Sequence, residues 1–340
     1  MTPKDQIVAH ARELGFDLVG VTTAQPPPHE PAFRDWLAAD MHGELGYLAR
    51  RAAERADLDR VLSGAQSVVV LGMNYYTGDP GEDSGARPRI ARYAWGPRDY
   101  HEVLAEKLGQ LTAFMQALAP PGTRARWYVD TGPILERDLA QRAGIGFIGK
   151  HTNLINRQLG NWLFLGEILT TLALAPDPPA KEYCGTCTRC LAACPTRAIV
   201  APYRLDARLC ISYLTIELKG SIPVELRPLI GDRVFGCDDC LEVCPWNRFA
   251  RVAPVRELQQ RHLPPLEEFL AWDDDQFRAC FRGTPIFRLK RRGFLRNVCV
   301  ALGNRGGQRS RPALDRALHD PEPLVREHAA WALDQLQQTP

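Results

Sequence analysis

The sequence predicts an α+β protein made of three parts: an N-terminal α/β domain, a cysteine-rich middle part and a C-terminal helical segment. Helix and strand patterns mix in the first half, closely spaced cysteines fill the middle, and a weak repeat of helical character ends the chain. We expect the domains to span residues 1–175, 176–251 and 252–340. A chain of 340 residues is long enough for two or three domains.

The first domain combines helices and strands. Helical periodicity occupies residues 5–14 and 100–118, and strand patterns occupy residues 67–76, 124–129 and 161–174. Such a mixture predicts an α/β or α+β domain. The Pro-rich stretch 175–183 marks its end.

Two cysteine runs define the middle part. The first is C-x2-C-x2-C-x3-C-P, from Cys184 to Pro195, and the second is C-x2-C-x3-C-P. The first pattern is that of bacterial ferredoxins with two 4Fe–4S clusters, in which three cysteines of a run bind one cluster and the last binds its neighbour. We therefore predict a ferredoxin-like domain with two clusters. Cluster one has the ligands Cys184, Cys187, Cys190 and Cys244, and cluster two has Cys194, Cys237 and Cys240.

Cluster two lacks a fourth ligand in the two runs. Cys210 is the only other cysteine between them, so we predict that it is the eighth ligand, moved upstream by an inserted loop. A zinc site is the alternative, which seven cysteines at these spacings disfavour. Cys280 and Cys299 lie among apolar residues and are predicted to be buried side chains. Because the segment is short and loop-rich, we expect the clusters to organise it.

The composition favours a cytoplasmic metalloprotein. The N-terminal residues show neither a basic stretch before an apolar run nor a twin arginine, so we expect no export signal. No stretch of about eighteen apolar residues is free of charge, so we expect no membrane span. Ten cysteines in such a chain favour metal binding in a reducing compartment over disulfides. We expect a monomer.

The C-terminal part has a repeat and a basic segment. Residues 296–303 and 327–334 align at a spacing of 31 residues and predict a HEAT-like helical repeat. Between Arg282 and Arg316 there are ten Lys or Arg residues and one acid, Asp315. This asymmetry indicates a face that binds a polyanion, with a solvated helical surface as the alternative.

Three further motifs are less specific. The glycines of residues 144–150 match two nucleotide-binding patterns, the dinucleotide-binding loop and the P-loop. A helical pattern precedes them where the first needs a strand, and His151 stands where the second needs a hydroxyl residue. We therefore interpret both matches as coincidence. His101 begins a D-x-H pattern that Leu104 breaks, and we expect it to be an ordinary helix-start residue. Asp130 follows a strand and precedes a helix start. It is either a helix cap or a general acid beside a cofactor.

Long blocks of the chain resemble the epoxyqueuosine reductase family. They include "VDTGPILERDLAQRAGIGFIGKHTNLIN", "CISYLTIELKG", "GCDDCLEVCPWN" and "LRNVCVALGN", and they run from about Ser67 to Asn304. The resemblance implies an enzyme that reduces epoxyqueuosine to queuosine at the wobble position of tRNA, the last step of queuosine biosynthesis. It also implies cobalamin as the reactive centre, two 4Fe–4S clusters as an electron relay and an architecture related to reductive dehalogenases.

The resemblance also implies roles for individual residues. The proton donor is Asp130, whose pKa we expect burial to raise. The incomplete D-x-H pattern agrees with base-off cobalamin, and residues expected around the corrin, besides Asp130, are Arg55, Tyr93, Asn153, Ser212, Asp238 and Asp239.

The substrate is expected to be tRNA with epoxyqueuosine in its anticodon loop, where the target base must be unstacked. Contacts to its backbone are expected from Arg288, Lys290, Arg291, Arg292 and Arg296. Electrons are expected from an external low-potential donor.

Two other functions remain open at this point. One is a corrinoid reductive dehalogenase-like reductase, which the lack of a twin arginine and the basic C-terminal segment disfavour. The other is a non-catalytic ferredoxin-type electron carrier that also binds RNA. Such a carrier would not need the large first domain.

Overall fold

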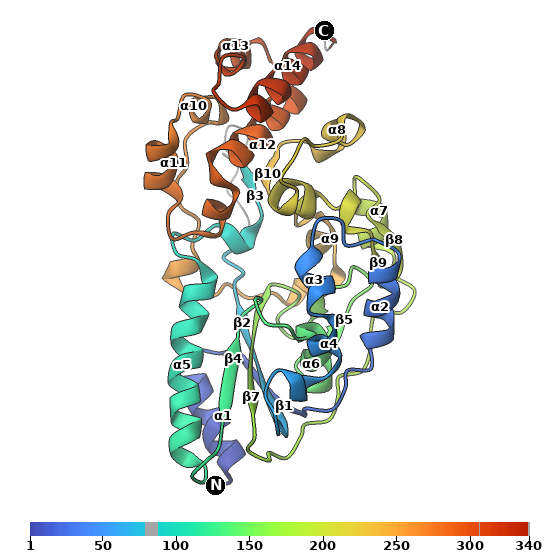
Figure 1. The fold of residues 1–340 in the computed structure, drawn as a ribbon, viewed down its shortest axis with the longest axis vertical. Helices are drawn as coiled ribbons and strands as arrows, with labels where there is room; N and C mark the ends of the chain where they lie inside the picture. The colour runs from blue at the N-terminus through green and yellow to red at the C-terminus, as the bar shows by residue number, and fades with distance from the viewer. Residues whose placement is uncertain (79–87, 306, 339–340) are drawn as a thin grey trace.

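A four-stranded antiparallel sheet forms the centre of the first domain (Figure 1). The computed structural model describes residues 1–78, 88–305 and 307–338. The strands lie in the order β1 (Leu18–Thr23), β2 (Ser67–Asn74), β7 (Leu163–Thr170) and β4 (Ala125–Tyr128). Because each pairing in this sheet is antiparallel, the domain is α+β, which corrects the α/β description predicted from the mixed pattern.

Helices cover both faces of the sheet. Helices α1 (Pro3–Glu13) and α5 (Tyr100–Leu118) pack on one face, and α6 (Glu136–Arg142) packs on the other. Strand β7 alternates accordingly, with Phe164 and Ile168 in the core beneath α5 and Leu169 in the core beneath α6. The expected helix 100–118 matches α5, which begins where the Asp99 side chain accepts a hydrogen bond from the backbone of His101.

Short elements surround this sheet and carry the loops of the site. They are α2 (Glu30–Ala38), α3 (Gly46–Arg50), α4 (Ala52–Ala56), the 3-10 helices η1 (Leu58–Arg60) and η3 (Arg92–Ala94), and the paired strands β5 (Phe147–Ile148) and β6 (Leu154–Ile155). Strand β3 (Arg89–Ile90) pairs in parallel with β10 (Arg233–Phe235) and so joins the first domain to the cysteine-rich segment.

The cysteine-rich segment follows an irregular Pro-rich stretch, as predicted. Its helices α7 (Arg189–Ala193) and α9 (Asp239–Glu242) carry the two cysteine runs and pack together. Between them lie β8 (Ile199–Ala201), β9 (Arg204–Leu205), η4 (Ala207–Leu209), the π-helix η5 (Tyr213–Glu217), η6 (Val224–Leu226) and α8 (Arg227–Ile230), and η7 (Pro245–Phe249) follows α9.

The C-terminal segment is helical (Figure 1). It contains η8 (Arg256–Leu258), α10 (Leu266–Phe269), α11 (Asp274–Phe281), η9 (Pro285–Leu289), α12 (Lys290–Arg305), η10 (Gln308–Ser310), α13 (Arg311–Ala317) and α14 (Pro323–Gln338). The two repeat segments lie on α12 and α14, which pack closely. A Cβ at Gly303 would come within 2.9 Å of the Cα of Ala332. The HEAT-like classification stays a prediction. Within the described part of the chain, no helix combines the length and the apolar character needed to cross a membrane.

One hydrophobic core joins the C-terminal helices to the cysteine-rich segment. Ile211, Leu214 and Phe235 from that segment pack with Phe294 and Val298 of α12. This core differs from our expectation that the clusters alone organise the segment. A large apolar surface also holds it in place.

A buried arginine strengthens this junction. Arg296 is fully buried, and its guanidinium donates to the backbone oxygens of Leu214 (2.8 Å), Leu218 (2.8 Å) and Gly220 (2.6 Å) and to the Asn297 side chain. Burial lowers its pKa to about 10, because the charged form loses hydration. The hydrogen bonds offset that cost and tie α12 to the loop after Cys210.

We predict that Arg296→Met destabilises the protein, whereas Arg292→Met on the exposed side of the same helix does not. The Met side chain fills much of the volume but leaves buried carbonyl oxygens without donors, at roughly 1–3 kcal/mol for such groups. Thermal denaturation of both variants by circular dichroism is the measurement. Equal midpoints for the two variants would show that the buried guanidinium does not hold the junction.

Candidate functional site

The cysteines assigned to cluster one face a common cavity. Cys184, Cys187, Cys190 and Cys244 all line a cavity of about 200 Å³. Burial raises the pKa of Cys244 to about 11, and the charges of the three other thiols add to the shift. Four thiols around one space are the arrangement that a 4Fe–4S cluster requires.

A second group of four thiols includes Cys210. Burial raises the pKa of Cys240 well above its usual value, and the nearby thiols of Cys210, Cys237 and Cys194 contribute. Burial likewise raises the pKa of Cys237 to about 12, with a contribution from Cys210. The charge of the Cys210 thiol thus acts on both Cys237 and Cys240, and the assignment of Cys210 as the eighth ligand stays a prediction.

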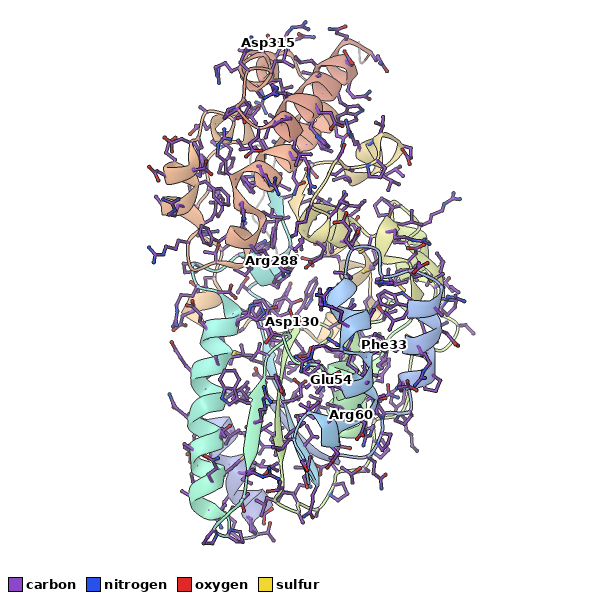
Figure 2. The ribbon with its side chains drawn as sticks, viewed as in Figure 1. Phe33, Glu54, Arg60, Asp130, Arg288 and Asp315 are labelled. Atoms are coloured by element: carbon purple, nitrogen blue, oxygen red, sulfur yellow. The ribbon has the colours of Figure 1, made fainter. Side chains whose placement is uncertain are left out.

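The candidate acid, Asp130, lies in the loop between β4 and α6, below Arg288 in Figure 2. Its backbone φ is +56°, a conformation that Asp tolerates better than most residues. Its Oδ2 accepts a 2.9 Å hydrogen bond from the Tyr100 hydroxyl and lies 3.5 Å from Nε2 of His101. Helix α6 begins after Leu135 and has no side-chain cap, so the alternative role of Asp130 as a helix cap is wrong.

The surroundings of Asp130 keep it ionised. Desolvation by the surrounding protein would raise the pKa of Asp130, whose side chain is still 56% exposed, but hydrogen bonds from His101 and Tyr100 and the charges of His101 and Arg288 bring it below its ordinary value. The expectation of a raised pKa is therefore not met. Burial would also lower the pKa of His101, but hydrogen bonds to Asp130 and Asp99 raise it to about 9.

Two of the expected corrin residues lie at this loop. Arg55 is buried and donates to the backbone oxygen of Gly132, 3.4 Å away. The Tyr93 ring packs edge-on against Tyr100, with centroids 5.8 Å apart. Burial raises the pKa of Tyr93, and the charges of both Asp130 and Asp238 influence it. The Tyr93 ring also lies 5.9 Å from that of Phe235, so Tyr93 contacts both the partner of Asp130 and the chain just before Cys237.

The other expected corrin residues lie near the second thiol group or at the β5–β6 turn. Ser212 donates to the backbone oxygen of Cys237 (3.5 Å), and the backbone N–H of Asn153 donates to Nδ1 of His151 (3.1 Å). Asp238 accepts from the backbone of Arg92 (2.7 Å), and burial raises its pKa to about 7.

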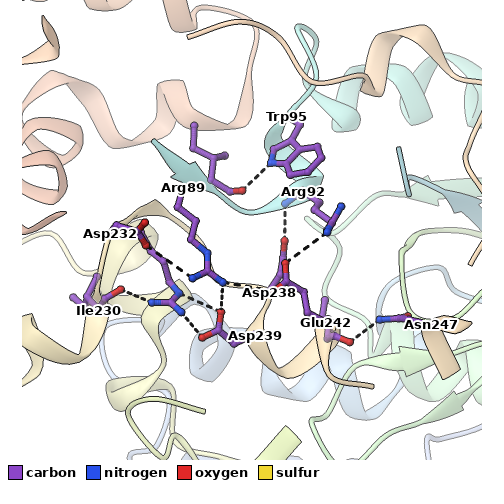
Figure 3. A network of polar contacts seen from close by, with 12 residues as sticks. Arg89, Arg92, Trp95, Ile230, Asp232, Asp238, Asp239, Glu242 and Asn247 are labelled. Atoms are coloured by element: carbon purple, nitrogen blue, oxygen red, sulfur yellow. Dashed lines mark hydrogen bonds and ion pairs between the residues drawn. The ribbon is translucent and has the colours of Figure 1, made fainter. Parts of the chain in front are cut away.

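Asp239 belongs to an ion-pair network. It pairs with Arg89 (2.8 Å) and with Arg233 (Figure 3). The two arginine side chains therefore balance the negative charge of Asp239 within the protein.

The basic C-terminal segment divides into exposed and buried residues. Arg288, Lys290 and Arg292 are exposed, and Arg288 also pairs with Glu217 at 2.7 Å. Arg291 is buried and donates to both carboxyl oxygens of Asp320, and Arg296 is the buried arginine described above. The expectation that Arg291 and Arg296 contact RNA is therefore wrong, because their guanidinium groups are enclosed by protein partners.

Comparison with known proteins identifies the family. The chain is 44% identical to an epoxyqueuosine reductase of Xanthomonas campestris, over 96% of this chain and 94% of that one. It is 42% identical to that of Escherichia coli, over 95% of this chain and 86% of that one. This chain belongs to the epoxyqueuosine reductase family.

Family models and solved structures agree with this membership. Residues 55–131 match the model "Epoxyqueuosine reductase QueG, DUF1730", and residues 183–247 match a 4Fe–4S double cluster binding domain. The fold resembles an epoxyqueuosine reductase solved with an epoxyqueuosine-modified tRNA-Tyr stem loop. The TM-score is 0.88 and the identity 33%, over 98% of this chain and 90% of that one.

A Bacillus subtilis epoxyqueuosine reductase is similarly close, with a TM-score of 0.87 and 32% identity, over 98% of this chain and 90% of that one. Its structure is described as having the catalytic aspartate loop swung out of the active site. Membership in the epoxyqueuosine reductase family makes this chain an oxidoreductase and decides against a non-catalytic electron carrier. The double-cluster domain decides against zinc.

Sequence analysis missed several residues around Asp130. His101 was expected to be an ordinary helix-start residue, yet it lies between the carboxylates of Asp99 and Asp130. Glu136 and Glu167 were not singled out, although their carboxyls influence each other and Asp130. One signal was present in the sequence: Glu167 is a lone acid within a strongly apolar strand pattern.

For Cys210→Ala we predict loss of iron and of the cluster-two EPR signal, because one of four thiolates around that cluster would be missing. Iron analysis and low-temperature EPR after anaerobic reconstitution are the measurements. Cys280→Ala is the control, because this cysteine lies outside both cysteine runs and the charge that influences its pKa is that of Arg261, not of a thiol. Two unchanged 4Fe–4S signals in Cys210→Ala would refute the assignment.

Proposed function

We propose that this chain reduces epoxyqueuosine to queuosine at the wobble position of tRNA, the last step of queuosine biosynthesis. The observation that carries the proposal is the order of groups within a member of this family. The Tyr93 ring packs against Tyr100, the hydrogen-bond partner of Asp130, and also against Phe235, two residues before the predicted ligand Cys237. Electron carriers and a proton donor therefore approach one place in the protein.

Base-off cobalamin is the cofactor that we propose for this place. When bound, it supplies the low-potential reductant that acts on the substrate carbon. The residues at this place fit base-off cobalamin, because Nδ1 of His101 faces Asp99 at 2.7 Å and Nε2 of the same ring faces Asp130 at 3.5 Å. Both ring nitrogens are thus engaged, and neither is free to bind a metal. Arg55, Tyr93, Asn153, Ser212 and Asp238 are the residues that we propose around the corrin.

The protein itself must manage the protons. Removing the epoxide oxygen as water and forming the alkene takes two electrons and two protons. Asp130 is the proposed donor, and Tyr100 and His101 hold its carboxyl in place. Arg288 stabilises negative charge nearby, since its charge lowers the pKa of Asp130.

We propose that an anticodon stem loop lies along the exposed part of the basic segment. Arg288, Lys290 and Arg292 provide cations for phosphates, and the target base is unstacked to reach Asp130. The electrons come from an external low-potential donor that acts on cluster one, whose cavity is also lined by the exposed side chains of Tyr183, Arg189 and Arg248.

Asp130→Asn is predicted to abolish most turnover without loss of fold or cofactors. Asn tolerates the same positive φ and still accepts a hydrogen bond from Tyr100, but it carries no acidic proton. General-acid catalysis is worth roughly 10²–10⁴-fold, so single-turnover conversion should fall by about that factor. The assay measures queuosine in epoxyqueuosine-containing tRNA after pre-reduction of the enzyme. Near wild-type rates in a fully loaded variant would exclude Asp130 as the donor.

For tRNA binding, we predict that the double variant Lys290→Glu, Arg292→Glu weakens affinity and flattens its salt dependence. Each lost phosphate contact lowers the slope of log affinity against log salt by about one. The charge-matched control is Arg34→Glu, Arg60→Glu, which reverses two exposed arginines of the first domain. If both double variants bind tRNA equally at moderate salt, the basic segment is only a solvated surface.

A further inference from the structure

Two carboxyls lie behind Asp130 that the proposed reaction does not yet use. Glu167 is fully buried in the middle of β7, opposite Val70 of β2 and Tyr128 of β4. Leu165 and Leu169, two positions away on either side, point to the same face. An acid among these apolar neighbours is costly unless it is neutral or hydrogen-bonded.

The partner of Glu167 is another acid, Glu136. Among the described residues, no N–H or hydroxyl donor bonds to either carboxyl oxygen of Glu167 or to the buried Oε1 of Glu136. Helix α6, which begins with Glu136, packs on β7, which carries Glu167, and the two carboxyls influence each other's pKa. Two ionised carboxylates would repel each other and share no hydrogen, so the pair must hold at least one proton. Burial and the charge of Asp130 raise the pKa of Glu136 to about 8, and burial and the charge of Glu136 raise that of Glu167 well above its usual value.

This pair adjoins the candidate acid. Glu136 is the first residue of α6, and its carboxyl is within hydrogen-bonding reach of the Asp130 backbone. The other charged or titratable groups that influence Glu136 are Arg137, Arg55 and Tyr100. Asp130 itself is kept ionised by His101, Tyr100 and Arg288, so it must receive a proton before it can donate one.

We propose that Glu136 and Glu167 form a proton store that protonates Asp130 during turnover. In the transfer, the O–H bond of Glu136 breaks, an O–H bond forms on Asp130, and Glu167 passes its proton to the Glu136 carboxylate. Asp130 then delivers this proton to the departing epoxide oxygen, and a second transfer from the reprotonated Glu136 through Asp130 supplies the other proton of the water. The two protons that become part of water are replaced from solvent after product release. This role rests on the proposed function, because that reaction consumes the protons.

The test compares Glu136→Gln and Glu167→Gln with wild type. Gln has nearly the same shape but holds no transferable proton. Wild-type single-turnover rates should fall as the pH rises through about 8, where the Glu136 proton is lost. In Glu136→Gln the rate should drop roughly 10²-fold below that pH, at the low end for proton-transfer groups, and the alkaline decline should disappear. In Glu167→Gln the rate should also fall, but the alkaline decline should remain, because Glu136 still titrates.

The control is Asp138→Asn, which changes another buried carboxylate of α6 that pairs with His29 and Arg142 instead. It should retain the wild-type pH profile even if stability falls. Wild-type pH profiles in both Gln variants with full iron content would overturn the proposal.

A readout without turnover separates this proposal from the function itself. Infrared difference spectra across a pH titration of wild-type protein should show the C=O band of a buried, protonated carboxyl, and Glu167→Gln should lose it. An unchanged C=O band in both Gln variants would refute the proton store, even if the enzyme is active. Conversely, if the C=O band is present but the wild-type enzyme leaves epoxyqueuosine unchanged, the proposed function is contradicted and the proton store is not.

Discussion

The crossing of the two cysteine runs is the constraint on which the rest of the structure depends. Cys194 leaves the first run to join the second group of thiols, and Cys244 leaves the second run to join the first group. The helices that carry the runs, α7 and α9, must therefore lie side by side. The thiol group that includes Cys210 is thereby placed between Tyr93 of the first domain and the apolar core under α12.

The carboxyls around Asp130 are chemically similar, but their surroundings shift their pKa values in opposite directions. Asp130 meets His101, Tyr100 and Arg288, which lower its pKa, whereas the pKa values of Glu136 and of the fully buried Glu167 are raised by burial and by neighbouring acids. Such a separation of pKa values between neighbouring acids is a common arrangement for moving protons at neutral pH. Because the opposed environments come from β4, β7, α5 and α6, the sheet and its helices act as the frame of the site.

The basic C-terminal segment shows how one charge pattern can serve two purposes. Arg292 and Arg296 are four residues apart on α12 and would share a helix face, yet one is exposed and the other fully buried. The difference arises because α12 crosses the loop at Leu214–Gly220, whose carbonyl oxygens surround Arg296. Half of the segment therefore holds the cysteine-rich part in place, and the exposed half remains for a polyanion.

The sequence by itself determined features that depend on local spacing. The double-cluster domain, the helix at 100–118 and the buried strand predicted at 67–76 and observed at 67–74 follow from cysteine intervals and periodicity, which act over a few residues. Only the tertiary structure decided the antiparallel sheet, the burial of Arg291 and Arg296, and the neighbours of Asp130. Those depend on contacts between distant segments: Glu167 meets Glu136 from 31 positions away, and Arg296 meets Leu214 from 82. The pattern of charge and hydropathy along the chain does not predict such pairings, because packing energy arises only when the chain has folded.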